Sequence, residues 1–267
     1  MMELHTPSPD VASTRRLRLL IAFNGSGYHG WQSGRSGYGV ADMMQRVLAE
    51  TLGVTDDVVS SSRTDSGVHA HGLVAHADVP VKHANRKADA LCALLNSKLP
   101  ADIRIREVTW AAPSFHARFD AQWKEYRYSI WNSPVMHPLR NGQAWHVAVP
   151  LDIHAMRKAA STLTGLHDFR AFTSRRKGEL GASTRNMMKL FVSRSGGDVT
   201  IRLVADGFLY KMCRAIVGTL VLVGHGKLAP EEIPRLLENG SPRTPGANAP
   251  AHGLVLWQVG YGKRRVF

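Results

Sequence analysis

The chain has 267 residues, of which 44% are hydrophobic and 21% charged, and its formal net charge is +13. This length suits one large domain or two smaller ones with a buried core. The composition is that of a globular protein, and no run of about twenty apolar residues predicts a membrane span. The positive charge favours a polyanionic partner, with nucleic acid as the first hypothesis and general basicity as the alternative.

The first half of the chain reads as β-α-β-β-α-β, preceded by a polar segment over residues 1–14 that is predicted to be a flexible tail rather than a signal peptide. Apolar residues recur at helical spacing in two segments that end at Gly53 and before Pro100. Alternating or β-branched segments predict the strands. The expected elements are a strand over residues 16–23, a helix over 40–52, strands at 58–59 and 73–79, a helix over 86–99 with Leu91, Leu94 and Leu95 facing inward, and a strand over 103–108.

A linker over residues 111–114 divides an N-terminal half (15–110) from a C-terminal half (111–267). The C-terminal half has a similar mixture of strands and helices. Its expected elements are a strand over 125–131, a helix from the cap Asp152 through Leu163, a turn over 165–169, a basic loop over 170–189, a hairpin of 191–193 and 200–204, helices over 209–223 and from Pro230 to Gly240, and a last strand over 253–259. The pattern predicts an α+β fold of two similar α/β halves, with mainly antiparallel sheets and helices packed on one face.

Cysteine and histidine usage points away from metal and redox chemistry. Cys92 and Cys213 lie far apart in apolar helical patterns, which favours core packing and a reducing, cytoplasmic location over a disulfide. No Cys or His pattern has the spacing of a zinc site, and no glycine-rich phosphate loop predicts a nucleotide cofactor. We interpret His69, His71 and His76, which share one predicted strand, as polar-face residues.

A polar loop over residues 60–70, between two predicted strands, carries the candidate catalytic group, Asp65. Arg63 precedes it by two residues, and residues i and i+2 of an extended chain point to the same side. A guanidinium beside the carboxylate would favour its ionised form. Gly67 allows a sharp turn directly after the aspartate. The alternative is an ordinary Asp-Ser-Gly turn with a surface ion pair that contributes little.

Several motifs, in order along residues 16–261, together resemble the TruA family of tRNA pseudouridine synthases. The loop is similar to the family's Arg-Thr-Asp-x-Gly-Val-His motif. The other similar segments are Gly25-Ser26-x-Tyr28-x-Gly30-Trp31-Gln32, Phe115-His116-Ala117-Arg118-Phe119, Lys124-x-Tyr126-Arg127-Tyr128, Gly207-Phe208-Leu209-Tyr210-x-Met212-x-Arg214, and Ala249-Pro250-Ala251-x-Gly253-Leu254. One such segment would be weak evidence, whereas the ordered series is specific.

The resemblance implies the pseudouridine synthase fold and an isomerase that converts uridine to pseudouridine in the anticodon stem-loop of tRNA, at tRNA positions 38–40. It also implies a homodimer and no cofactor. By the same resemblance Asp65 is the catalytic aspartate, Arg63 helps to extrude the base, and Tyr126 lies against the uracil. Arg214 matches a pocket arginine that can pair with the aspartate, and Leu254 matches an apolar residue near the target base.

The chemistry agrees with these assignments. Moving the ribose from N1 to C5 of uracil involves no redox step, and one carboxylate can serve as nucleophile or base. A base paired in a helix has to leave the stack first, and an aromatic face can hold it afterwards.

Other interpretations remain open at this point. Tyr126 and Leu254 can be core residues, Arg214 can neutralise a buried acid, and the basic segment 174–177 can be a solvated loop. A related synthase acting on other RNA uridines, or a non-catalytic RNA-binding protein, would share much of the pattern.

Overall fold

The structure is a computed structural model that describes residues 14–174, 181–239 and 246–262. The predicted tail, apart from Thr14, and residues 175–177 of the basic segment lie outside the described residues. The helices are α1 (Val40–Leu52), α2 (Ala88–Asn96), α3 (Ile153–Thr162), α4 (Met212–Gly224) and α5 (Ile233–Asn239). The strands are β1 (Thr14–Phe23), β2 (Val59–Ser60), β3 (His69–Pro80), β4 (Ile103–Trp110), β5 (Trp123–Asn132), β6 (Trp145–Val147), β7 (Gly165–Asp168), β8 (Thr184–Ser195), β9 (Asp198–Ala205) and β10 (Leu254–Gly260).

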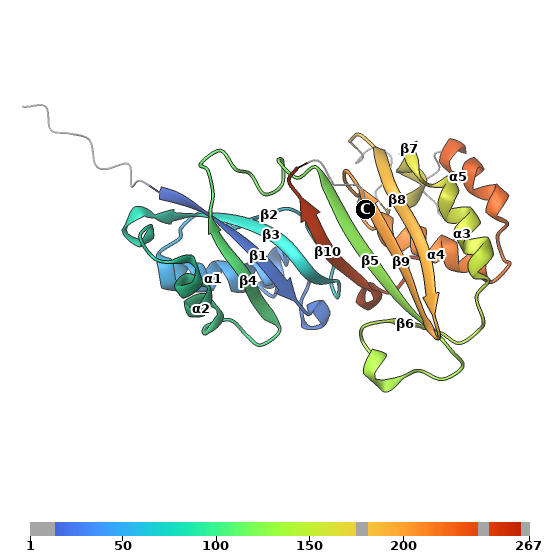
Figure 1. Ribbon diagram of the computed structural model, residues 1–267, viewed down its shortest axis with the longest axis horizontal. Coiled ribbons are helices and arrows are strands. Elements are labelled where there is room, and N and C mark those ends of the chain that lie inside the picture. Colours follow the sequence, from blue (N-terminus) through green and yellow to red (C-terminus); the bar gives the residue numbers. More distant parts are fainter. Residues whose placement is uncertain (1–13, 175–180, 240–245, 263–267) are drawn as a thin grey trace, which may run out of the picture.

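The described strands form one ten-stranded sheet that runs through both halves of the chain (Figure 1). Its main path is β4-β1-β3-β10-β5-β9-β8-β7, with β2 beside β3 and β6 beside β5. The pairs are antiparallel except β10 with β3 and β5 with β6. The predicted α+β, mainly antiparallel architecture is confirmed. The two halves share a single sheet because β10, the last strand, inserts between β3 and β5.

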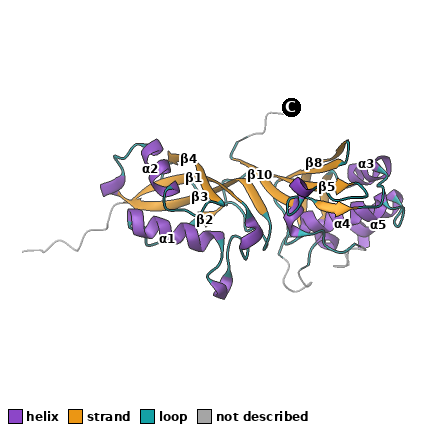
Figure 2. Cartoon of the chain, turned by 90° about the horizontal axis from the view of Figure 1, so that it is seen from below, coloured by secondary structure: helices purple, strands orange, loops and turns teal. Residues whose placement is uncertain are grey.

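Alternation along the strands explains which face of the sheet carries the core. In β1, Leu17, Leu19 and Ile21 are fully buried, while the residues between them are partly exposed. The apolar stripe of α1 covers this face in the first half, and Gly53 ends that helix in the left-handed conformation, as predicted. Figure 2 shows α1 and α4 on the same side of the sheet, one under each half. The candidate site lies between these two halves, as described below.

Three predicted elements differ from the structure. The predicted turn over 165–169 contains the short strand β7, which lacks β-branched residues and gains its pairing from β8. The strand β8 begins at Thr184, inside the predicted loop over 170–189. Helix α2 is shorter than predicted, and Leu94 is only half-buried while Leu91 and Leu95 are fully buried.

The histidines of β3 also differ from expectation. His69 and His76 are buried rather than on a polar face, whereas His71 is half-buried. The Nδ1 atom of His76 accepts a hydrogen bond from the backbone N–H of Ala117 at 3.1 Å. Burial lowers the pKa of His76 to about 4, with the charge of Arg16 acting in the same direction. The ring is therefore a neutral structural acceptor.

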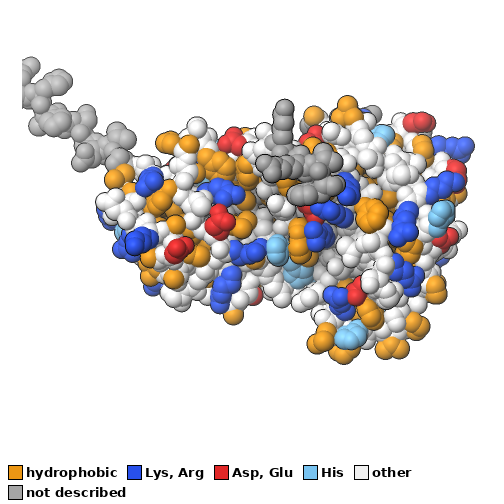
Figure 3. Space-filling view, viewed as in Figure 1, with side chains coloured by type: hydrophobic (Ala, Val, Ile, Leu, Met, Phe, Trp, Pro, Cys, Tyr) orange, Lys and Arg blue, Asp and Glu red, His pale blue; other side chains and the backbone are white. Residues whose placement is uncertain are grey.

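Basic side chains are distributed widely over the molecule. In the face shown in Figure 3, Lys and Arg side chains lie over both halves, with fewer acidic side chains between them. Among the described residues, no helix is long and apolar enough to cross a membrane.

Candidate active site

A cleft of about 790 Å³ contains all of the predicted site residues. Its walls come from the loop between β2 and β3, from β5, from the segment before and at the start of α4, and from the first residue of β10. These elements are far apart in sequence and meet because β10 joins the sheets of the two halves. The lining includes Arg63, Asp65, Tyr126, Arg214 and Leu254.

The carboxylate of Asp65 pairs with the guanidinium of Arg214. The Nη1 atom of Arg214 donates to Oδ2 of Asp65 at 3.0 Å, and the Nε atom donates to the backbone carbonyl of Ala249 at 2.7 Å. Both charged side chains are mostly buried, with 16% and 19% of their surface exposed. A charge-assisted hydrogen bond in such surroundings orients the carboxylate. Arg214 is on the first turn of α4, 149 residues from its partner.

Arg63 does not occupy the position expected from its spacing. The guanidinium next to the carboxylate belongs to Arg214, whereas Arg63 is exposed in the cleft and has no ion pair with the described part of the chain. The loop around Asp65 turns instead of continuing as a strand, so the same-side rule for residues i and i+2 does not apply. Arg63 is thus a cation available to a ligand of the cleft.

The N-terminal glycine motif supports the loop that carries Asp65. The backbone N–H of Trp31 donates to the carbonyl of Thr64 at 3.2 Å, and Gly67 donates to the carbonyl of Tyr28 at 3.4 Å. Gly30 has φ +87°, and a Cβ there would lie 2.4 Å from the Thr64 carbonyl oxygen. Only glycine fits this close approach. The sequence showed the motif, but its contact with the loop is a long-range feature.

His69 links three segments behind the loop. Its Nδ1 atom accepts from the backbone N–H of Gly25 at 3.0 Å, so Nε2 carries the proton and donates to the carbonyl of His252 at 3.1 Å. Burial lowers the pKa of His69, which keeps the ring neutral and this pattern intact. The histidine therefore connects the N-terminal motif to the segment that precedes Leu254.

The aromatic wall of the cleft is formed by Tyr126 and Phe208. Their ring centroids are 5.0 Å apart in an edge-to-face arrangement. Tyr126 is 7% exposed, and burial raises the pKa of its hydroxyl, so the ring is neutral. Leu254 is 5% exposed at the start of β10 and lines the same cavity. The wall provides one apolar side to a cleft that is otherwise polar and basic.

Lys124 is a cleft residue that the sequence reasoning did not assign. Its Nζ atom donates to the carbonyl of Ser61 at 2.6 Å, at the beginning of the loop that carries Asp65. Burial lowers its pKa to about 8, and the charges of Arg118 and Arg185 lower it in the same direction. Its place in the Lys124-x-Tyr126 alternation could have indicated that it shares a sheet face with Tyr126.

The geometry provides one carboxylate paired with a guanidinium, an apolar wall and several cations. Such a site can supply a nucleophile or base to a planar, anionic ligand such as a nucleotide. Within the described ranges, no cluster of three or more His, Cys, Asp or Glu side chains could hold a metal ion.

Comparison with known proteins identifies the relatives of this chain. A family model described as tRNA pseudouridine synthase matches residues 159–262. The chain is 38% identical to tRNA pseudouridine synthase A of Acetivibrio thermocellus over 247 residues, covering 92% of this chain and all of the relative. It is 41% identical to the proteins of the same name from Brevibacillus brevis and Syntrophotalea carbinolica, again over 92% of this chain, with 100% and 96% of the relatives covered.

Proposed function

Because the chain belongs to the TruA family of tRNA pseudouridine synthases, we propose that it isomerises uridines 38–40 in the anticodon stem-loop of tRNA, with Asp65 as the catalytic carboxylate. The observation that carries the assignment of Asp65 is its pairing with Arg214 inside the cleft that also contains Arg63, Tyr126 and Leu254. Membership of this family shows that the enzyme is a tRNA-modifying isomerase. The roles of the site residues and the target positions 38–40 are what we propose.

The reaction breaks the bond between C1′ and N1 and forms the bond between C1′ and C5, after which C5 loses its proton and N1 gains one. Asp65 can attack C1′, attack C6 or remove the 2′ proton, and each route uses the same carboxylate. Arg214 holds that carboxylate in place at the cleft through a charge-assisted hydrogen bond.

The other residues bind the extruded nucleotide. A uridine within the anticodon stem has to leave its stack, which costs a few kcal/mol. Arg63, exposed in the cleft, is available to fill the space that the uridine leaves. The Tyr126 ring and Leu254 provide the surface on which the uracil rests. The positive charge of the chain supports binding to the phosphates.

The test is incubation of the purified protein with unmodified tRNA transcripts, followed by mapping of pseudouridine. Product at positions 38–40 supports the proposal, whereas product only elsewhere favours a related synthase. Asp65→Asn should abolish product while tRNA still binds, and Asp89→Asn, an exposed acid on α2, serves as the control. Activity of Asp65→Asn equal to that of the control would refute the catalytic assignment.

We further propose that the enzyme works as a homodimer in the cytoplasm. Cys92 and Cys213 are free thiols, in keeping with a reducing compartment. Light scattering on the purified protein tests the dimer, since a mass near 29.4 kDa would identify a monomer.

A further inference from the structure

Tyr210 is an aromatic residue of the cleft to which the proposed reaction gives no task. Its side chain is 46% exposed, whereas Tyr126 in the same cleft is 7% exposed. No described residue hydrogen-bonds its hydroxyl group. An exposed ring in a cleft that binds nucleotides is a surface on which a base can stack.

Lys211, the next residue, also lines the cleft and has an unusual backbone. Its φ is +59°, and among the described residues it is the one non-glycine residue with a positive φ. Its ammonium lies 5.0 Å from the centroid of the Tyr210 ring. A left-handed backbone costs a non-glycine residue free energy and tends to persist where function requires it.

The backbone of Tyr210 is held in place. Its carbonyl accepts a hydrogen bond from the Thr173 hydroxyl at 3.1 Å and from the Ser174 N–H at 3.5 Å. Lys211 is also the N-cap of α4, the helix that carries Arg214. The turn that presents the exposed ring therefore continues directly into the helix that orients Asp65.

We propose that Tyr210 and Lys211 form a second nucleotide subsite, in which the ring stacks on the base next to the target uridine and the ammonium binds a phosphate of that strand. This inference rests on the proposed function, because extrusion of one uridine removes the stacking partner of its neighbour. A ring near the catalytic pair can replace that partner, and a cation beside the ring matches the adjacent phosphate.

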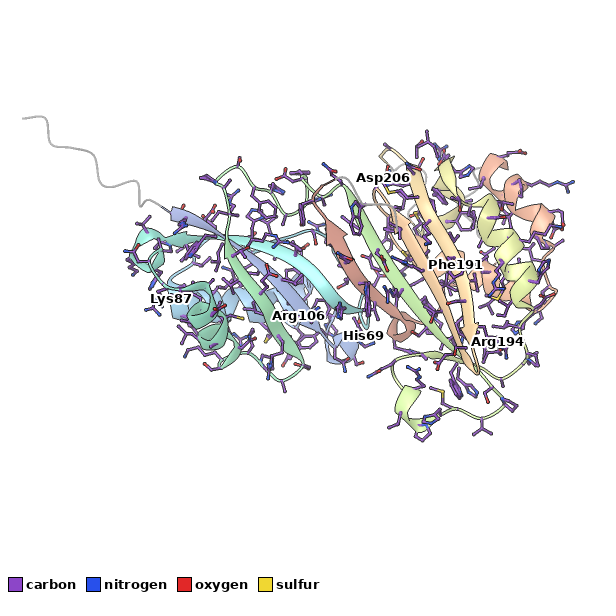
Figure 4. All side chains as sticks on the ribbon, in the orientation of Figure 1. His69, Lys87, Arg106, Phe191, Arg194 and Asp206 are labelled. Carbon is purple, nitrogen blue, oxygen red and sulfur yellow. The ribbon has the colours of Figure 1, made fainter. Side chains whose placement is uncertain are left out.

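The first test compares Tyr210→Ala with a matched control, Phe191→Ala. Phe191 is 49% exposed and lies 5.9 Å from the Lys189 ammonium, but it is on β8 and outside the cleft (Figure 4). Tyr210→Ala should weaken binding of an unmodified tRNA transcript by about 5- to 150-fold, the range for loss of one stacked base. Phe191→Ala should bind like the wild type, and Tyr210→Phe should restore affinity. Equal affinities of the two alanine variants would overturn the inference.

A direct readout uses an anticodon stem-loop with 2-aminopurine beside the target uridine. Binding to the wild type should quench the probe beyond its quenching in free RNA, and Tyr210→Ala should lose that additional quenching. The same quenching in both proteins would overturn the inference. If Tyr210→Ala does not fold, Tyr210→Gln replaces it.

The charge is tested with Lys211→Asn, since asparagine tolerates the left-handed backbone. The slope of log affinity against log salt concentration should fall in magnitude by about one. An unchanged slope would remove the phosphate contact from the inference. Absence of pseudouridine with the wild-type protein would refute the proposed function. Normal product with the wild type, together with Tyr210 variants that bind tRNA with unaltered affinity, would refute only the subsite.

Discussion

The contact between Gly30 and the loop that carries Asp65 gives the sharpest test of how the candidate site is positioned. In Gly30→Ala, the new Cβ would lie 2.4 Å from the Thr64 carbonyl oxygen, where real contacts are 3.0 Å or longer. The carbonyl therefore has to move by more than half an ångström, and Asp65 is the next residue. A displacement of about 1 Å at a reacting group can lower the rate by about 10²-fold, so we expect a loss of that order in kcat.

The matched control is Gly53→Ala. Gly53, at the end of α1, also has a positive φ, +64°, but no atom of the described residues lies within 4 Å of the Cβ that alanine would add. Both variants carry the backbone strain of a left-handed alanine, about 1 kcal/mol of stability. Steady-state pseudouridine formation at saturating tRNA gives kcat, and urea unfolding in parallel gives the stability, so the two measurements separate displacement at the site from backbone strain. If kcat of Gly30→Ala is within twofold of that of Gly53→Ala, the N-terminal motif does not position Asp65.

Three further outcomes are expected. Arg214→Met leaves the Asp65 carboxylate without its charged partner. The kcat should fall by about 5- to 150-fold, the effect of losing about 1–3 kcal/mol. Steady-state kinetics should show this lower kcat together with an unchanged KM for tRNA. Lys124 has a pKa of about 8 in the folded chain against about 10.4 when unfolded, so the unfolded chain binds more protons between these values. The free energy of unfolding of the wild type minus that of Lys124→Met should therefore rise by about 2 kcal/mol between pH 7.5 and pH 9.5, as measured by urea unfolding. His76 has a pKa of about 4 in the folded chain against about 6.5 in the unfolded chain, so the unfolded chain binds more protons between these values. The free energy of unfolding therefore falls by up to about 3 kcal/mol as the pH falls from 6.5 through 4. His76→Asn, which keeps an acceptor at the δ position, should lose less stability than the wild type over that interval. Equal losses of stability with falling pH in the two proteins would contradict the interpretation of His76 as a neutral acceptor.

Features that depend on neighbouring residues were predictable from the sequence. The α1 helix with its Gly53 cap, the Asp152 cap of α3 and the β8–β9 hairpin follow from local spacing and local chemistry. The loop position of Asp65 between two strands followed in the same way. The family motifs, read in order, also indicated five residues that the structure brings together in one cleft, namely Arg63, Asp65, Tyr126, Arg214 and Leu254.

Features that depend on distant pairing did not follow from local spacing. Local spacing placed Arg63 beside Asp65, whereas the resemblance to the family indicated Arg214. The structure pairs Asp65 with Arg214, because the loop turns and α4 arrives from the other half of the chain. The β7 strand has no intrinsic strand pattern and depends on β8 for its hydrogen bonds. His69 is buried because its two ring nitrogens find backbone partners in segments 44 and 183 residues away. Such contacts are properties of the assembled sheet.

The central position of β10 has a consequence for biosynthesis. This strand, residues 254–260, follows the other described strands in the chain, yet it pairs with β3 and β5 and joins the halves of the molecule. During translation the loop that carries Asp65 is made early, and nearly two hundred further residues are added before β10 can complete the cleft. A nascent chain in which β10 has not yet been made therefore exposes the edges of β3 and β5 that this strand covers, and such unpaired edges can pair with other chains.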